Sequence, residues 1–270
     1  MRQSPSLVAV DIGNARVKLG CFAAGRRDGV PEPAETFSLL GDEPGLQGIP
    51  PWLAKANVET VRWCIASVNR PAATRFIDWL RGHRPGDSIV LLASGDLPLE
   101  VRLPRPDMVG IDRLVDAVAA NGLRHPEQAA AIVDVGSAIT VDLVSADGAF
   151  LGGAILPGIH MAGRALHDYT DMLPLVDMAE LTVPPPALGT ATVPAIQAGL
   201  FWGAVGAVRE LLAQFRAMIG GKIPQVFLTG GAGAQVAELL GSGARYVPHL
   251  TLSGIALAVC EEGVSALRDP

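Results

Sequence analysis

The sequence predicts an α/β protein built from two halves with a common internal plan. One pattern occurs twice: a short apolar strand, an Asp-x-Gly turn and a second strand, beginning at Leu7 and again about 120 residues later at Ala129. The length of 270 residues exceeds the usual domain size of roughly 100–150 residues, so two domains are expected. Apolar residues make up 49% and charged residues 18%, which excludes a disordered chain.

In the first half, strands and helices are predicted to alternate. Short apolar runs predict strands at residues 7–10, 17–22, 58–66 and 88–93. Helical periodicity predicts helices at residues 72–82 and 112–121. In the second of these helices, Leu114, Val115 and Val118 fall on one face. Residues 31–51 are rich in Pro and Gly and are expected to be mostly loop.

The second half repeats the opening and then continues differently. Strands are predicted at residues 129–133, 139–144, 149–155 and 225–228, and helices at residues 204–218 and 234–240. Residues 181–208 carry no charge, but Pro residues interrupt them, and the continuous helical part from about Pro194 is too short to span a membrane. We interpret it as a core or interface helix, in which Gly199, Gly203 and Gly206 allow close helix packing.

The charge balance and the cysteines exclude several classes of partner and site. The net charge is −6, and without a basic cluster neither nucleic acid nor a membrane surface is expected as a partner. Cys21, Cys64 and Cys260 are too far apart for a metal knuckle, and we interpret them as small buried residues. Only a four-residue apolar run precedes Asp11, too short for a signal peptide, so a cytoplasmic location is expected.

The two Asp-x-Gly turns carry the chemistry of a phosphate site. Asp11 and Asp134 each end an apolar run, and the Gly two residues later permits a tight turn with exposed backbone N–H groups. Amides of this kind hold phosphates, and the acid holds a cation. Either turn alone is more simply a hairpin turn without a role. Two of them at matching positions favour a clamp for a nucleoside triphosphate.

Two further motifs admit both a functional and a structural interpretation. Gly230-Gly231 follows a strand and precedes a helix. Such a turn can bind a nucleotide, but it can also be a simple connection between a strand and a helix. In Val109-Gly110-Ile111-Asp112-Arg113, the acid stands at a helix start and the Arg can bind a carboxylate in two parallel bonds. Its structural alternative is a helix N-cap beside a solvated Arg.

Five motifs together resemble those of the type III pantothenate kinases, the family that also contains the Bvg accessory factors. They are, in chain order, DIGNARVK (11–18), VGIDR (109–113), DVGSAITVD (134–142), LGGAILPGI (151–159) and GTATVPAIQAG (189–199). The family patterns that they resemble are D-x-G-N-T-x-x-K, G-x-D-R, D-x-G-T-A-x-T, G-G-x-I-x-P-G and a G-x-x-T before a small-residue helix. The resemblance covers residues 11 to 199.

The resemblance implies a fold and an activity that the residues alone do not give. The fold is two ribonuclease-H-like domains of the acetate kinase, sugar kinase and actin superfamily, with the nucleotide cleft between them; we expect them at residues 1–125 and 126–270. The activity is ATP-dependent phosphorylation of pantothenate to 4′-phosphopantothenate, the first step of coenzyme A biosynthesis. Mg²⁺, a monovalent cation (K⁺ or NH₄⁺) and a homodimer are implied as well.

Position by position, the resemblance assigns a role to each motif. The first ATP-binding loop comprises Asp11, Ile12, Gly13, Asn14, Ala15, Arg16, Val17 and Lys18. Asp112 is the expected catalytic base, and the expected pantothenate-binding residues are Gly110, Ile111, Asp112, Arg113 and Thr192. Asp134 corresponds to the monovalent-cation ligand and Ser137 to an ATP contact. Phosphoryl transfer depends mostly on positioning and charge neutralisation, which suits such a set.

Three departures from the family patterns leave alternatives open. Ala15 replaces a Thr and loses its hydroxyl, and Ser137 replaces a Thr and keeps it. Leu103, three residues before Pro106, stands where an aromatic residue often precedes G-x-D-R. Ala15 is the feature that favours a non-catalytic, nucleotide-binding regulator. Asp112 and Asp134 argue against that alternative, because a pure binding module needs no base. A kinase of the same superfamily acting on another small molecule is the third hypothesis.

Overall fold

Packing divides the chain into two compact units. The computed structural model describes residues 6–23, 29–40, 45–178, 183–241 and 243–260. The first unit contains the described residues up to Leu123 and those from His249 onward, and the second contains Arg124–Pro248. The helix at residues 250–260 therefore belongs to the first unit. The two domains expected at residues 1–125 and 126–270 stay a prediction.

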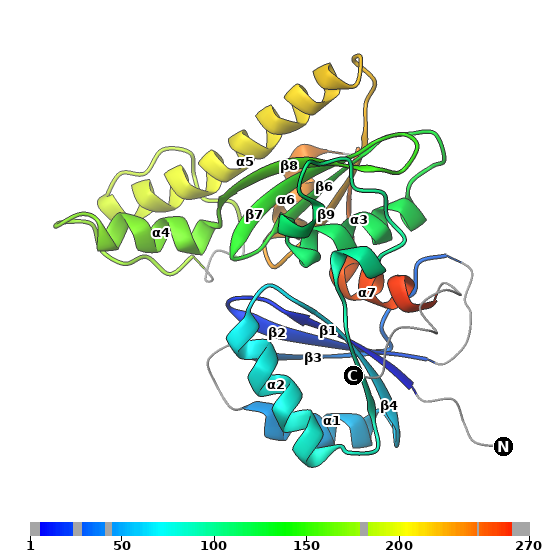
Figure 1. The fold of residues 1–270 in the computed structure, drawn as a ribbon. Coiled ribbons are helices and arrows are strands. Elements are labelled where there is room, and N and C mark those ends of the chain that lie inside the picture. Colours follow the sequence, from blue (N-terminus) through cyan, green and yellow to red (C-terminus); the bar gives the residue numbers. More distant parts are fainter. Residues whose placement is uncertain (1–5, 24–28, 41–44, 179–182, 242, 261–270) are drawn as a thin grey trace. The chain divides into compact units, whose positions relative to one another are not determined.

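The first unit contains a mixed five-stranded sheet (Figure 1). Its strands are β1 (Ser6–Ile12), β2 (Arg16–Phe22), β3 (Glu35–Leu40), β4 (Val61–Ser67) and β5 (Ser88–Leu91). Their order is β3-β2-β1-β4-β5. The three strands β1, β2 and β3 pair antiparallel, and β4 and β5 continue the sheet parallel to β1.

The second unit repeats this topology strand for strand. Its strands are β6 (Ala130–Val135), β7 (Ala138–Val144), β8 (Phe150–Pro157), β9 (Gln225–Thr229) and β10 (Ala244–Tyr246). Their order is β10-β9-β6-β7-β8, with β6, β7 and β8 antiparallel and β9 and β10 parallel to β6. The α/β fold with a duplicated strand–turn–strand, predicted from the sequence, is confirmed.

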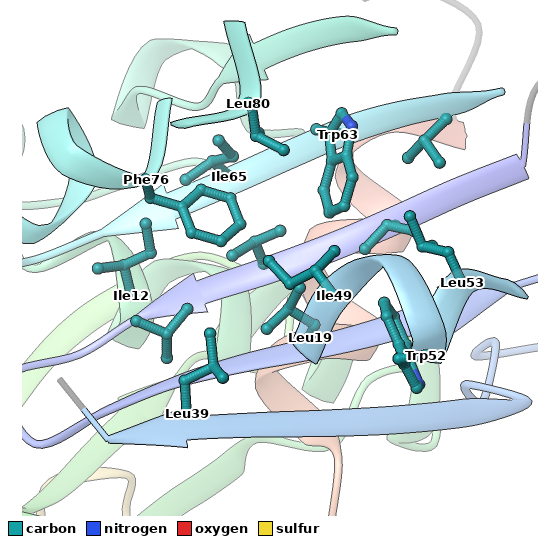
Figure 2. Packing of buried hydrophobic residues seen from close by; sticks show 14 of the residues in the cluster. Ile12, Leu19, Leu39, Ile49, Trp52, Leu53, Trp63, Ile65, Phe76 and Leu80 are labelled. Atoms are coloured by element: carbon teal, nitrogen blue, oxygen red, sulfur yellow. The ribbon is translucent and has the colours of Figure 1, made fainter. Parts of the chain in front are cut away.

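One face of the first sheet is covered by α1 (Ile49–Lys55) and α2 (Arg70–His83). Alternate residues Val8, Val10 and Ile12 of β1 point into this core, as the two-residue period of a strand requires. Large side chains fill it, among them Trp63 and Phe76, whose rings meet edge to face with centroids 6.0 Å apart (Figure 2). Burial of this face anchors the strand whose end carries Asp11.

The opposite face of the same sheet accepts α7 (Leu250–Cys260), which also packs against α3 (Ile111–Leu123). Small residues line that face: Ala9 of β1 pairs with Gly20 of β2 and Cys64 of β4. A Cβ at Gly20 would lie 3.1 Å from Leu252 Cδ1, so the missing side chain lets α7 approach. Cys21 and Cys64 are buried, as expected, while the side chain of Cys260 lies outside the described residues.

In the second unit, α5 (Thr192–Met218) and α6 (Gly233–Leu240) pack on the sheet, and α4 (Ile159–Asp168) packs beside α5. The core contains Val133, Val141 and Leu228 from the strands and Phe201 and Val205 from α5. Within the described ranges, no helix combines the length and apolar character needed to cross a membrane.

The structure differs from the sequence predictions mainly between residues 31 and 51. This stretch is not mostly loop: it contains β3, a 3₁₀ turn at Gly45–Gly48 and the start of α1, while residues 41–44 lie outside the described part. Pro50 and Pro51 mark the first turn of α1, where the missing N–H groups cost nothing. Two shorter 3₁₀ turns, at Ser94–Asp96 and Pro106–Met108, lie between β5 and α3.

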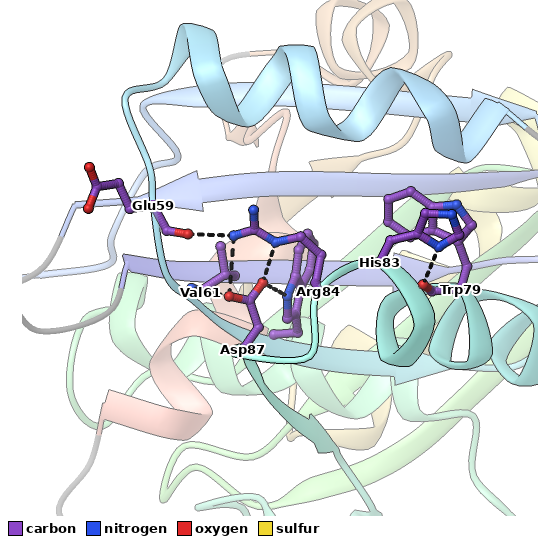
Figure 3. Close-up of polar contacts among 7 residues, drawn as sticks. Glu59, Val61, Trp79, His83, Arg84 and Asp87 are labelled. Atoms are coloured by element: carbon purple, nitrogen blue, oxygen red, sulfur yellow. Dashed lines mark hydrogen bonds and ion pairs between the residues drawn. The ribbon is translucent and has the colours of Figure 1, made fainter.

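A buried carboxylate ties the start of β4 to the loop before β5 (Figure 3). Asp87 accepts hydrogen bonds from the Val61 backbone N–H at 3.0 Å and from Trp63 Nε1–H at 2.9 Å. Arg84 Nε donates to Asp87 at 2.7 Å, and Arg84 Nη2 donates to the Glu59 carbonyl at 2.6 Å. The Asp87 side chain is 3% exposed. This network holds the end of β4 remote from Ser67.

Replacing Asp87 by Ala is therefore expected to destabilise the first unit by about 3–5 kcal/mol, since it leaves a half-buried guanidinium, an indole N–H and an amide without their acceptor. Urea unfolding followed by Trp fluorescence measures the change. Asp78→Ala is the control, because Asp78 pairs with Arg81 at the surface of α2 and its loss is expected to change stability by no more than about 0.5 kcal/mol. Equal effects of the two substitutions would contradict the structural role of Asp87.

Candidate functional site

The first predicted phosphate loop is the tight turn between β1 and β2. Asp11 pairs in register with Lys18, and its carboxylate lies 3.9 Å from Lys18 Nζ. The Gly13 N–H donates to the Arg16 carbonyl at 3.0 Å and closes the turn. Asp11 is 9% exposed, whereas the turn residues 14–16 are exposed. The turn thus exposes its backbone to solvent next to the largely buried Asp11 and its partner Lys18.

The end of β4 joins this turn through the carbonyl of Ile12. The Val68 N–H donates to that carbonyl at 3.1 Å, and Ser67 Oγ lies 3.4 Å from it. Ser67 Oγ also accepts the Asn69 N–H, and the Asn69 side chain caps α2 by accepting the Ala72 N–H. Ser67 and Asn69 were not among the candidates because each signal is a single polar residue after a strand.

The Gly110–Arg113 segment lies next to the same strand end. A Cβ at Gly110 would lie 2.5 Å from Asp112 Oδ1 and 3.6 Å from Val68 Cγ1, so the segment is in contact with the residue bonded to Ile12. Asp112 is the second residue of α3, half-buried, and its Oδ1 accepts the Arg113 N–H at 2.9 Å. Asp112 therefore does not occupy the N-cap position, and only glycine at 110 leaves room for its carboxylate.

His249 adds a further ionisable group to this unit. Burial lowers the pKa of His249, and the Lys18 ammonium lowers it further, while Glu32 partly offsets both. The imidazole is accordingly neutral at pH 7, and the charged groups that act on it are Lys18 and Glu32. Sequence reasoning gave His249 no role, because an isolated His has no spacing pattern to identify it.

The second predicted phosphate loop is the turn between β6 and β7. The Gly136 N–H donates to the Ala138 carbonyl at 3.0 Å, and Gly136 and Ser137 are exposed. The Gly158 N–H before α4 donates to the Ser137 carbonyl at 3.1 Å, and a Cβ at Gly158 would overlap that carbonyl. The Leu156-Pro157-Gly158 bend thus packs on the loop of Ser137.

The turn between β9 and α6 lies against Asp134. Thr229 pairs with Asp134 in register, and Gly230 adopts φ +88°, a conformation that favours glycine. A Cβ at Gly230 would overlap Asp134 Oδ1 and the Val135 carbonyl. Gly231 is exposed, and a Cβ there would meet nothing within 4 Å. One face of the turn is therefore packed on the acid and the other is open.

Thr192 is the first residue of α5 and is exposed. The preceding Gly189 packs directly on the helix backbone, since a Cβ there would lie 2.5 Å from Ala195 Cα. The structure thus brings Asp11, Lys18 and Asp112 close to one strand end in the first unit, and Asp134, Ser137 and Gly230 together in the second. Thr192 also belongs to the second unit, but it is distant from Asp134, Ser137 and Gly230 in the sequence.

The carboxylates of Asp11 and Asp134 suit metal ions whose other coordination positions are filled by oxygen atoms of a bound ligand or of water. Among the described residues, no group of three His, Cys, Asp or Glu side chains forms a ready metal cage. Mg²⁺ usually keeps several waters and binds one or two carboxylates plus substrate phosphates, which a single Asp beside an open turn can accommodate. Asp11 and Asp134, each beside a turn held by glycine, have this character.

Comparisons with known proteins agree with the motifs. The sequence profile of type III pantothenate kinases matches residues 7–214. A type III pantothenate kinase of Dehalococcoides mccartyi is 34% identical over 260 residues, covering 94% of this chain and 97% of that one. The chain belongs to the type III pantothenate kinase family. Its kinase character follows from that membership, and the resemblance seen in the five motifs is confirmed.

Solved structures share the fold of this pantothenate kinase family member. A protein of Campylobacter jejuni assigned as a Baf family transcriptional activator covers 93% of this chain and 96% of its own, with a TM-score of 0.58 and 20% identity. Lmo2764 of Listeria monocytogenes, assigned as an N-acetylmannosamine kinase, covers 95% and 99%, with a TM-score of 0.50 and 14% identity. At these identities the likeness shows the fold alone, that of the sugar kinase and actin superfamily.

Proposed function

We propose that this protein phosphorylates pantothenate with ATP, forming 4′-phosphopantothenate in the cytoplasm, where ATP is supplied. Family membership over nearly the whole chain supports the substrate. The observation that carries the proposal is the position of Asp112: its carboxylate fits against Gly110 at the start of α3, beside the strand end that bears Asp11. A base next to a phosphate loop is what phosphoryl transfer to an alcohol requires.

In this mechanism, Asp112 accepts the proton of the primary hydroxyl of pantothenate as that oxygen attacks the γ-phosphorus. The bond from the γ-phosphorus to the β–γ bridging oxygen breaks, and ADP is the leaving group. Arg113 binds the pantothenate carboxylate in two parallel hydrogen bonds, and Thr192 contacts the same substrate. The half-buried position of Asp112 limits its contact with water, which favours transfer of the substrate proton over exchange with solvent. Gly110 and Ile111 provide the backbone along which the substrate lies.

The phosphates of ATP lie, in this proposal, on the β1–β2 turn from Asp11 to Lys18, with Ser137 as a further contact. Lys18 neutralises phosphate charge as it now neutralises Asp11, at 3.9 Å. Bound Mg²⁺ supplies charge neutralisation for the transferring phosphoryl group. Asp134 holds the monovalent cation, K⁺ or NH₄⁺, and its carboxylate is positioned for this by the packed face of the Gly230 turn.

We also propose that the protein is a homodimer formed through α5. Gly199, Gly203 and Gly206 lie one helical turn apart on an exposed face, and a Cβ at any of them would meet nothing within 4 Å. Val193 and Leu188, next to the start of α5, are 40% and 81% exposed. An uncovered glycine face on a long helix suits close packing against a second helix, and the resemblance implies a dimer.

The decisive experiment is a coupled ADP-release assay with purified protein, MgATP and pantothenate. ADP formation that requires pantothenate and K⁺ is expected, with little turnover when a bulky organic cation replaces K⁺, because such a cation does not fit beside a carboxylate in a tight turn. Turnover of another small alcohol or acid instead of pantothenate would assign a different substrate. Nucleotide binding without any turnover would favour the regulatory alternative that Ala15 suggested.

Asp112→Asn is expected to lower kcat by about 10²–10⁴-fold, because it removes the base while preserving the shape of the side chain. Initial rates at saturating substrates measure the loss, and calorimetric titration with MgADP checks that nucleotide binding survives. Asp107→Asn is the control, since Asp107 pairs with Arg105 at the exposed surface before α3. Full activity of folded Asp112→Asn protein would end the catalytic assignment.

Gly203→Gln tests the dimer. The wild-type protein is expected to have twice the 28.0 kDa chain mass in light scattering coupled to gel filtration, and the variant is expected to be monomeric. The new side chain has free space within its own chain but prevents close helix approach. Gly82→Gln on α2 is the matched control, because its Cβ also meets nothing within 4 Å. If Gly203→Gln stayed dimeric, as Gly82→Gln is expected to do, the proposed α5 interface would be refuted.

A further inference from the structure

Tyr246 is the last residue of the short edge strand β10, and its side chain reaches over the turn between β9 and α6. The hydroxyl donates to the Gly230 carbonyl at 3.3 Å. The ring lies against the first residue of α6, since a Cβ at Gly233 would be 2.9 Å from Tyr246 Cε2. The Val247 N–H donates to the Leu228 carbonyl at 2.7 Å, which fixes the backbone that carries the ring.

The bond from Tyr246 meets the turn at its most constrained residue. Gly230 combines φ +88° with direct packing on Asp134 and Val135. Its carbonyl accepts the Gly233 N–H at 3.1 Å as well as the Tyr246 hydroxyl, while the Ala232 N–H donates to the Val135 carbonyl at 3.4 Å. Two donors on one carbonyl fix the orientation of the Gly230–Gly231 peptide, and with it the open face at Gly231.

We propose that Tyr246 is a positioning residue for nucleotide binding: it holds the Gly230–Gly233 turn against Asp134 so that the open face of the turn is preorganised for the nucleotide. The proposal rests on the proposed function, in which the protein binds ATP and Asp134, packed on this turn, holds the monovalent cation. A preorganised turn loses less conformational entropy on binding, so its ligand binds more tightly. Tyr246 acts only through Gly230 and does not contact the reacting atoms.

Tyr246→Phe isolates the hydroxyl, because it keeps the ring that packs on Gly233. We expect the dissociation constant of MgADP and the KM of ATP to rise about 2- to 10-fold, the range for loss of one neutral hydrogen bond. The KM of pantothenate is expected to stay unchanged. Tyr246→Ala removes the ring too and is expected to weaken nucleotide binding more, so that Phe is a partial rescue. Titration calorimetry with MgADP and steady-state kinetics give the two readouts.

The chain has only two tyrosines, so Tyr169→Phe is the matched control. Tyr169 follows α4 and is 88% exposed, and its hydroxyl loss is expected to change neither constant. A MgADP affinity of Tyr246→Phe equal to wild type would overturn the positioning role, as would an equal rise of both KM values, which indicates a general effect on the fold. Failure of the wild-type protein to bind MgADP would instead refute the proposed function itself.

Discussion

Two of the carboxylates proposed to act in this protein occupy space that a side chain would need at a neighbouring glycine. Asp112 fits against Gly110, and Asp134 fits against Gly230. Close packing against a glycine restricts the positions that each carboxylate can take, so the acid is already in place before a ligand binds. The rest of the architecture serves these contacts: the buried faces of the two sheets fix the strand ends from which the turns begin.

The sequence predicted the parts of this arrangement that are local. A strand, an Asp-x-Gly turn and a second strand are read within about a dozen residues, and both copies form the central hairpins of sheets with the same strand order. The start of α3 was equally accessible, because Gly110 and the periodic residues after it are adjacent in sequence. Motif order then identified the family, which the comparisons confirm.

The features that escaped prediction depend on contacts between distant residues or lack a periodic signal. Helix α7 is apolar almost all round because it is buried between the first sheet and α3, so it shows no amphipathic pattern. Strand β10 has three residues, and the bond from Tyr246 to Gly230 joins residues 16 positions apart. No sequence pattern around Tyr246 distinguishes it from an ordinary residue of an edge strand, because its hydrogen-bond partner is the backbone carbonyl of Gly230.

Because the chain returns to its first unit at His249, the two units are completed in the reverse of the order in which they begin. All five strands and three helices of the second unit lie between residues 124 and 248, whereas the first sheet stays uncovered on its α7 face until residues 250–260 are made. During synthesis from the N-terminus, the later unit is therefore complete before the earlier one. Until then, Ala9, Gly20 and Cys64 present an uncovered apolar surface, so the nascent first unit depends on residues 250–260, which are made after the whole second unit.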